Sequence, residues 1–144
     1  MANFLADAFR NSLIGKTSDY SARVDLDTDT IKAGFQDEGT ATPAVGNVFI
    51  TSFSSGLVPA FASCVTLGSP TVGVVAAGVF DAADTTFTAL TGASVEGIVV
   101  FKNVTVVGDS PFLFYYNTGI TGVPFTPSGG DVTIQWNASG LIQV

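Results

Sequence analysis

The chain has 144 residues, which is enough for one domain with a single core, and its five basic and twelve acidic residues give a net charge of −7. Charged residues make up 12% of the sequence and apolar residues 47%, so part of the apolar surface is expected to face a partner. The acidic balance and the scattered lysines and arginines would repel phosphate backbones and anionic lipids, which argues against nucleic-acid and membrane partners.

The first predicted element is a helix over residues 3–14, in which apolar residues recur at helical spacing and Asn3 can cap the start. Its apolar stripe either covers one end of the domain's own core or docks on another chain. We assign residues 1–24 to this helix and an arm, and residues 25–144 to a single β-rich domain. The residues of the stripe expected to contact another chain are Phe4, Leu5, Phe9 and Leu13.

Three aspartates at alternate positions, Asp25, Asp27 and Asp29, fit the first ligands of a calcium loop of the EF-hand type. Thr30 then stands where that loop needs glycine, and Gln36 stands where it needs a bidentate glutamate. The alternation after Asp29 favours a strand with an acidic start and one face open to water or a neighbour, and we predict no metal site.

The remainder of the chain reads as strands separated by clusters of Gly, Pro, Asp and Asn, which are residues typical of turns. This spacing predicts an all-β fold, an antiparallel β-sandwich or small barrel, with one N-terminal amphipathic helix. The most apolar strand, residues 94–102, is placed at the centre of the sheet. The expected strands are 48–53, 72–80, 85–90, 94–102, 111–117, 132–136 and 141–144.

Few groups that could catalyse a reaction are present, because the sequence has no histidine. Asp81 and Asp84 resemble a glycosidase pair by type, but their short spacing between two strands favours a turn. Glu96 lies in the most apolar strand, where an edge position or a pairing with Lys102 is the ordinary explanation. We therefore predict no enzyme activity and no cofactor.

Two further residues have a structural and a functional interpretation. Cys64 lies in an apolar stretch and is expected to be a small buried side chain rather than a reactive thiol. Trp136, on an alternating strand, is expected in the core, although Trp136, Tyr115 and Tyr116 could also stack on a sugar ring.

Three segments together resemble a group of small virion proteins of tailed bacteriophages: DTDTIKAGF, FDAADTTFTALTGASVEGIVVFKN and TGVPFTPSGGDVTIQWNASGLIQV. The resemblance covers roughly residues 25–144 in matching order, and its motifs are structural rather than catalytic. Ser128 replaces a common Asn of that group, and the helix before residue 25 has no counterpart in it.

This resemblance implies a capsid decoration or cement protein, often a homotrimer, that binds the outer surface of the head and stabilises the lattice of the major capsid protein. The sequence shows no signal peptide, so synthesis in the bacterial cytoplasm is expected. The alternative is a tail or fibre adaptor whose β-domain binds a tail protein or a host glycan. A small carboxylate-dependent hydrolase is a third, weaker interpretation. Loop 118–130 is expected to pack against the next protomer through Ile120, Val123 and Phe125.

Overall fold

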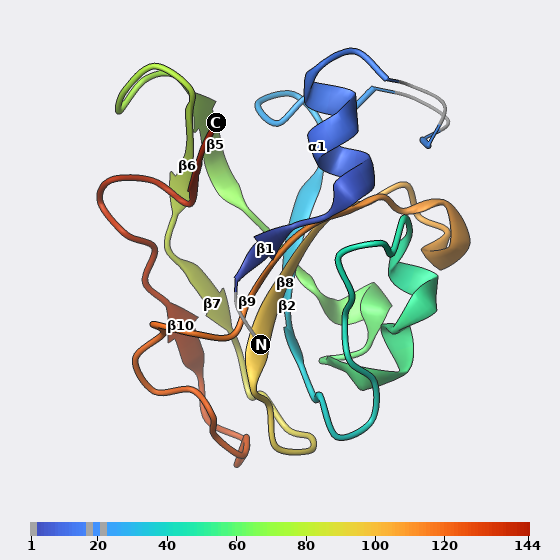
Figure 1. Cartoon of the computed structure of the whole chain (residues 1–144). Coiled ribbons are helices and arrows are strands. Elements are labelled where there is room, and N and C mark those ends of the chain that lie inside the picture. The colour runs from blue at the N-terminus through green and yellow to red at the C-terminus, as the bar shows by residue number, and fades with distance from the viewer. Residues whose placement is uncertain (1–2, 17–18, 21–22) are drawn as a thin grey trace.

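The computed structural model describes residues 3–16, 19–20 and 23–144. It is mostly β-structure with antiparallel pairing and one short helix, α1 (Asp7–Leu13), so the expected all-β class is confirmed (Figure 1). The strands of the described residues form three separate ladders and do not close into a barrel. Residues 1–2, 17–18 and 21–22 of the predicted N-terminal arm lie outside the described residues.

The largest sheet has the strand order β1-β9-β8-β2-β3, with β4 also pairing with β2. Its centre is β8, which pairs with β2 from Gly97↔Gln36 to Lys102↔Ile31 and with β9 on the other side. The central position predicted for this apolar segment is thus confirmed. The six strands are β1 (Phe4–Leu5), β2 (Ile31–Gln36), β3 (Leu57–Val58), β4 (Val65–Thr66), β8 (Gly97–Lys102) and β9 (Phe112–Tyr116).

Two smaller ladders complete the β-structure. One has two strands, and the other has the order β11-β6-β5. Segments from the middle and the C-terminal end of the chain lie side by side in both ladders. Their strands are β5 (Gly68–Val72), β6 (Val79–Ala83), β7 (Thr85–Phe87), β10 (Val132–Ile134) and β11 (Ile142–Gln143).

One face of the large sheet is covered by β6, β7 and α1. The ring of Phe35 on β2 lies 4.9 Å from that of Phe87 on β7, and the ring of Phe114 on β9 lies 6.4 Å from that of Phe80 on β6. Phe9 of the helix packs on Phe114 from the same side. Aromatic burial therefore joins the ladders into one core, because rings of this size contribute most of the apolar area removed from water.

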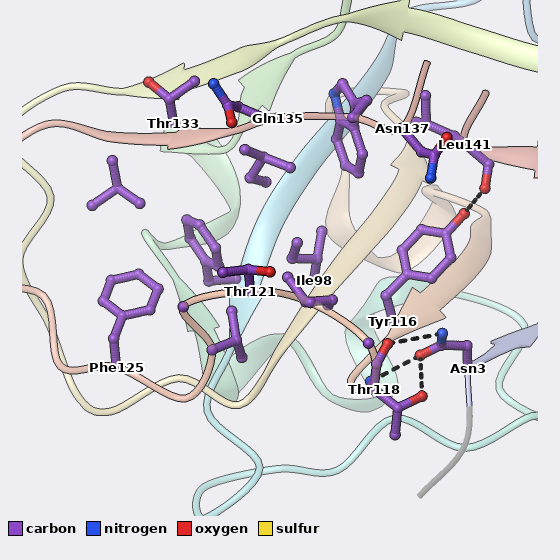
Figure 2. Close-up of a pocket in the computed structure, with 18 of the residues that line it drawn as sticks. Asn3, Ile98, Tyr116, Thr118, Thr121, Phe125, Thr133, Gln135, Asn137 and Leu141 are labelled. Atoms are coloured by element: carbon purple, nitrogen blue, oxygen red, sulfur yellow. Dashed lines mark hydrogen bonds between the residues drawn. The ribbon is translucent and has the colours of Figure 1, made fainter. Parts of the chain in front are cut away.

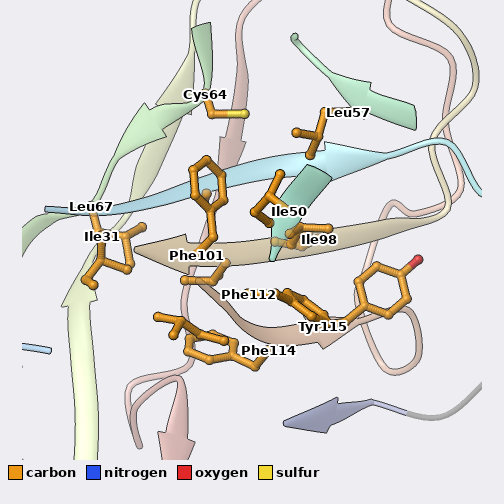
Figure 3. Close-up of a cluster of buried hydrophobic side chains, with 14 of the residues drawn as sticks. Ile31, Ile50, Leu57, Cys64, Leu67, Ile98, Phe101, Phe112, Phe114 and Tyr115 are labelled. Atoms are coloured by element: carbon orange, nitrogen blue, oxygen red, sulfur yellow. The ribbon is translucent and has the colours of Figure 1, made fainter. Parts of the chain in front are cut away.

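The opposite face of the large sheet is covered by residues 49–64, which form three short 3₁₀ turns around β3. Phe53 packs on Phe112 with ring centroids 4.8 Å apart, and Phe61 stacks on Phe101 at 5.4 Å. Figure 3 shows the buried side chains gathered along β2, β8 and β9. The 3₁₀ segments here are η1 (Ile50–Ser52), η2 (Ser54–Gly56) and η3 (Phe61–Ser63), and a fourth, η4 (Val107–Asp109), precedes β9.

This cover corrects the prediction that one face of β2 meets water or a neighbour. Gln36 is fully buried, and its amide donates to the carbonyls of Ala41 and Phe53. Gly34 leaves room for the Cys64 side chain, whose Sγ lies 2.7 Å from where a Cβ would stand. The alternation in the sequence was real, but the chain supplies its own second layer over the face expected to be open.

Several predicted boundaries were also wrong. The helix begins at Asp7 rather than at residue 3, because Phe4 and Leu5 pair as β1 with Tyr115 and Phe114. The expected strand 48–53 is largely a 3₁₀ turn. The expected strand 72–80 is instead the connection of the β5–β6 hairpin with a few residues of each strand.

Candidate functional site

A groove of about 640 Å³ lies between the loop after β9 and the segment from β10 to β11. The walls come from segments distant in sequence, with Thr121 and Phe125 on the loop side and Thr133 and Gln135 on the β10 side (Figure 2). Ile98 of β8 also lines the groove. The three residues predicted for protomer packing, Ile120, Val123 and Phe125, are all half-buried and line this groove.

Two aromatic residues of the groove are held by hydrogen bonds to the surrounding structure. The indole Nε1 of Trp136 donates to Thr85 Oγ1 at 3.0 Å, and the backbone N–H of Trp136 donates to Asp84 Oδ1 at 3.0 Å. The hydroxyl of Tyr116 donates to the Leu141 carbonyl, and burial raises the pKa of this phenol. Trp136 is half-buried and packs against the core, so the expected core position is reached only in part, and stacking on a sugar stays a prediction.

The loop wall is fixed by Asn3, which precedes β1. Its Oδ1 accepts hydrogen bonds from the backbone N–H groups of Asn117 and Thr118, at 2.9 and 3.0 Å, and its Nδ2 donates to the Thr118 carbonyl (Figure 2). Asn3 was expected to cap a helix, and it instead ties the start of the chain to the loop after β9. The groove therefore depends on residues near the N-terminus that no local pattern connects with it.

The residues predicted for contact at the helix face are not gathered on one exposed surface. Phe9 is 0% exposed and belongs to the core, so it offers no surface to a partner in this fold. Phe4 and Leu5 are half-buried in β1, where the ring of Phe4 packs against Phe112 and Tyr115. Leu13 is 40% exposed at the end of α1.

An apolar surface that the sequence analysis missed lies at the tip of the β5–β6 hairpin. Residues 72–77, VGVVAA, are all exposed, and Val74 reaches 75% exposure. The chain end is held beside them, because the N–H of Val144 donates to the Gly78 carbonyl at 3.0 Å and its side chain is exposed. We call residues 72–77 with Val144 the hairpin tip. A run of exposed valines without charge was the available signal, and it was interpreted as a strand.

The helix end adds to the apolar surface at the same end of the molecule. Ile14, directly after α1, is 87% exposed, and it follows the partly exposed Leu13. In Figure 1 the end of α1 and the hairpin tip both point toward the upper end of the view, where the C-terminus also lies. A group of exposed apolar side chains, such as that at the hairpin tip, is typical of an interaction surface.

The acidic residues singled out in the sequence have structural partners. Asp29 accepts a hydrogen bond from the backbone N–H of Asp25 at 2.7 Å and forms an ion pair with Lys102 Nζ at 2.7 Å. The pKa of the Asp27 carboxyl is raised by a side-chain hydrogen bond to Asp25 and by the charge of Asp25. The three aspartates lie in and around a turn before β2, not in an extended strand. Among the described residues, no group of three His, Cys, Asp or Glu side chains could hold a metal ion.

The other carboxylates are also used locally. Asp81 lies within β6, so the turn predicted at 81–84 is absent, and Asp84 holds the backbone of Trp136. Glu96 accepts from the Glu38 backbone N–H at 2.9 Å and from the Ser94 hydroxyl at 3.0 Å, rather than from Lys102. These contacts bring no pair of carboxylates into the groove.

A buried polar cluster around Glu38 was not predicted. Its Oε1 accepts hydrogen bonds from the Tyr115 hydroxyl at 2.7 Å and from Asn117 Nδ2 at 2.9 Å. The pKa of Tyr115 is raised, first by burial and then by this bond to Glu38. Cys64, by contrast, behaves as predicted, because it is buried and its burial raises the thiol pKa to about 12.

No model of a known protein family matches the chain, and no curated protein is significantly similar to it. In the part of the chain that the structure describes, none of the helices combines the length and the apolar character needed to cross a membrane.

Proposed function

We propose that this protein is a structural, non-enzymatic virion component, a capsid decoration or cement protein bound to the outer surface of a phage head. Its partner would be the major capsid protein, whose lattice it would stabilise as a homotrimer. The resemblance of residues 25–144 to such proteins supports this proposal, as does a domain that we class as a sandwich of the large sheet and the β6–β7 layer.

The hairpin tip is the observation that carries the proposal. Its exposed valines and alanines have no charged neighbour within residues 72–78, although the chain as a whole has a net charge of −7. Burying one valine side chain contributes about 1.5 to 3 kcal/mol, so burial of a few of these side chains would favour binding to the major capsid protein. Repetition over a lattice multiplies weak contacts of this kind without requiring a large interface.

The trimer would be formed through apolar residues at the same end, with Leu13 and Ile14 as the leading candidates because both are exposed. Ile120, Val123 and Phe125 are left out of this interface, since they line the groove. Sedimentation of the purified chain should give a trimer, and a clean monomer at all concentrations would contradict this part of the proposal.

The principal experiment is the addition of purified protein to phage heads that lack decoration. We expect binding to the outer surface, seen by electron microscopy, and greater resistance of the heads to heat and osmotic shock. The double variant Val74→Ser/Val75→Ser should fold normally, because both side chains are exposed, and should bind at least about tenfold more weakly.

The matched control is Val106→Ser, which changes a valine of comparable exposure, 55%, on the connection before β9. It should bind as the unchanged protein does. Failure of the protein to bind or protect heads would reject the proposal, and labelling of tails instead of heads would favour the adaptor alternative.

A further inference from the structure

We propose that the groove binds a neutral saccharide, with Trp136 as the stacking platform and Thr121 and Asn137 as hydrogen-bonding groups on opposite walls. The proposal concerns a site distinct from the hairpin tip. It does not depend on where the protein sits in a particle.

The charge of the lining is the first argument. All the described residues that line the groove are uncharged, although acidic residues outnumber basic ones by twelve to five in the chain. A neutral site gives a charged ligand no partner to replace its lost hydration. The volume of about 640 Å³ falls within the ordinary range of small-molecule sites, roughly 300 to 1,000 Å³.

Preformed aromatic surface is the second argument. Trp136 is half-buried and its ring orientation is fixed by the bond to Thr85, so little conformational freedom is lost when a ligand packs on it. Tyr116 and Phe125 also line the groove, and Phe125 is braced edge-on against Phe35 with centroids 5.2 Å apart. Rigid aromatic faces suit the C–H faces of a pyranose ring, which are apolar although the rim carries hydroxyls.

Unpaired polar groups on both walls are the third argument. Thr121 is exposed, its side chain makes no hydrogen bond among the described residues, and Figure 2 shows it on the loop side of the hollow. On the other side, Asn137 uses its Oδ1 to accept from the Ser139 N–H at 2.8 Å, which leaves its Nδ2 as a donor. The Thr121 hydroxyl can donate and accept, so the two side chains together offer both kinds of partner to sugar hydroxyls.

A chain segment of a second copy is the competing occupant. The aromatic, uncharged part of the lining would suit the centre of a protein interface as well. The Thr121 hydroxyl and the Asn137 amide on the two walls favour the saccharide, because a ligand that carries many hydroxyls pairs with both and an apolar peptide side chain does not.

The test uses the full chain and the emission of Trp136, which is the only tryptophan of the sequence. The probes are glucose, galactose, mannose and N-acetylglucosamine, with galacturonic acid and N-acetylneuraminic acid as anionic comparators. We expect a saturable change of emission with at least one neutral sugar, weaker binding of the anionic comparators, and NMR shifts at residues 121 and 137.

The variant Thr121→Val should weaken that binding roughly twofold to tenfold, the effect of one lost neutral hydrogen bond. Thr126→Val is the matched control, because Thr126 is an exposed threonine outside the groove lining, and it should leave binding unchanged. Both positions are exposed, so both variants should fold. Absence of a saturable response across the neutral sugars, equal loss in both variants, or an emission change caused by self-association alone would overturn the proposal.

Discussion

Gly97, the first residue of β8, offers a sharp test of how the buried polar cluster is packed. A Cβ at this position would lie 2.5 Å from Cζ and 2.6 Å from Cε2 of Tyr115, inside the 3.0 Å below which such contacts essentially do not occur. The Tyr115 ring is fully buried, packs against Phe4 at 5.7 Å and donates its hydroxyl to Glu38 at 2.7 Å. Gly97→Ala therefore forces the ring away from its hydrogen-bond partner.

Two effects set how much the free energy of unfolding of Gly97→Ala falls. Overpacking a core costs about 1 to 3 kcal/mol, and a hydrogen bond to a charged group contributes about 1.5 to 3 kcal/mol. Since one displacement of the ring causes both, we expect the free energy of unfolding to fall by about 3 kcal/mol and the melting temperature to fall by about 6 to 12 °C. Tyr115→Phe removes the bond without the overpacking, so the double variant should lose less than the sum of the two single losses.

Urea unfolding followed by far-ultraviolet circular dichroism measures these changes. The control is Gly46→Ala, because a Cβ at Gly46 meets nothing within 4 Å and the backbone there is not left-handed. We expect that control to stay within about 1 kcal/mol of the unchanged protein, on the stabilising side. Equal stability of Gly97→Ala and Gly46→Ala would refute the proposed packing of Tyr115.

Three further predictions concern other sites. Because burial raises the pKa of Cys64 to about 12, iodoacetamide at pH 8 should alkylate the native thiol far more slowly than the urea-unfolded one, and equal rates would contradict the burial. Lys102→Met removes the ion pair with Asp29, in which Lys102 is 12% exposed, and should cost roughly 1 to 3 kcal/mol in urea unfolding, where no loss would count against the pair. The Thr40 hydroxyl keeps the pKa of Asp37 below its ordinary 3.8, so this bond stabilises the fold above that value and is lost as the pH falls through the lower folded pKa. Thr40→Val should raise the pKa of Asp37 in an NMR titration, and an unchanged pKa would show that the hydroxyl is not its cause.

The strands that were predicted correctly are those whose pattern of apolar residues matches their burial in the folded sheet. The strands β8 and β9 were found because continuous apolar runs bounded by turn residues are typical of the middle of a sheet. Residues 48–53 were equally apolar and β-branched, yet they cover the sheet as a 3₁₀ turn. Periodicity does not separate a buried strand from a buried turn of the same composition, so this part of the second layer was missed.

Residues from both walls of the groove were singled out in the sequence, but they were not predicted to lie in one site. Ile120, Val123 and Phe125 were selected as a contact loop, and Trp136 was considered separately for stacking on a sugar. The structure places them around one groove because Phe125 pairs with Val95 and β10 pairs with β7. These pairings join distant parts of the chain, and a single sequence contains no local signal for them.

The strand order of the large sheet has a consequence for biosynthesis. Phe4 pairs with Tyr115, so β1 waits for a partner that is made much later in translation, whereas β2 can already pair with β3 and β4. Until residue 116 has emerged, β1 and α1 have no sheet to cover, and their phenylalanines stay in contact with solvent. The nascent chain is thus vulnerable to aggregation until β9 is made, and slower elongation over residues 36–97 would lengthen that exposure.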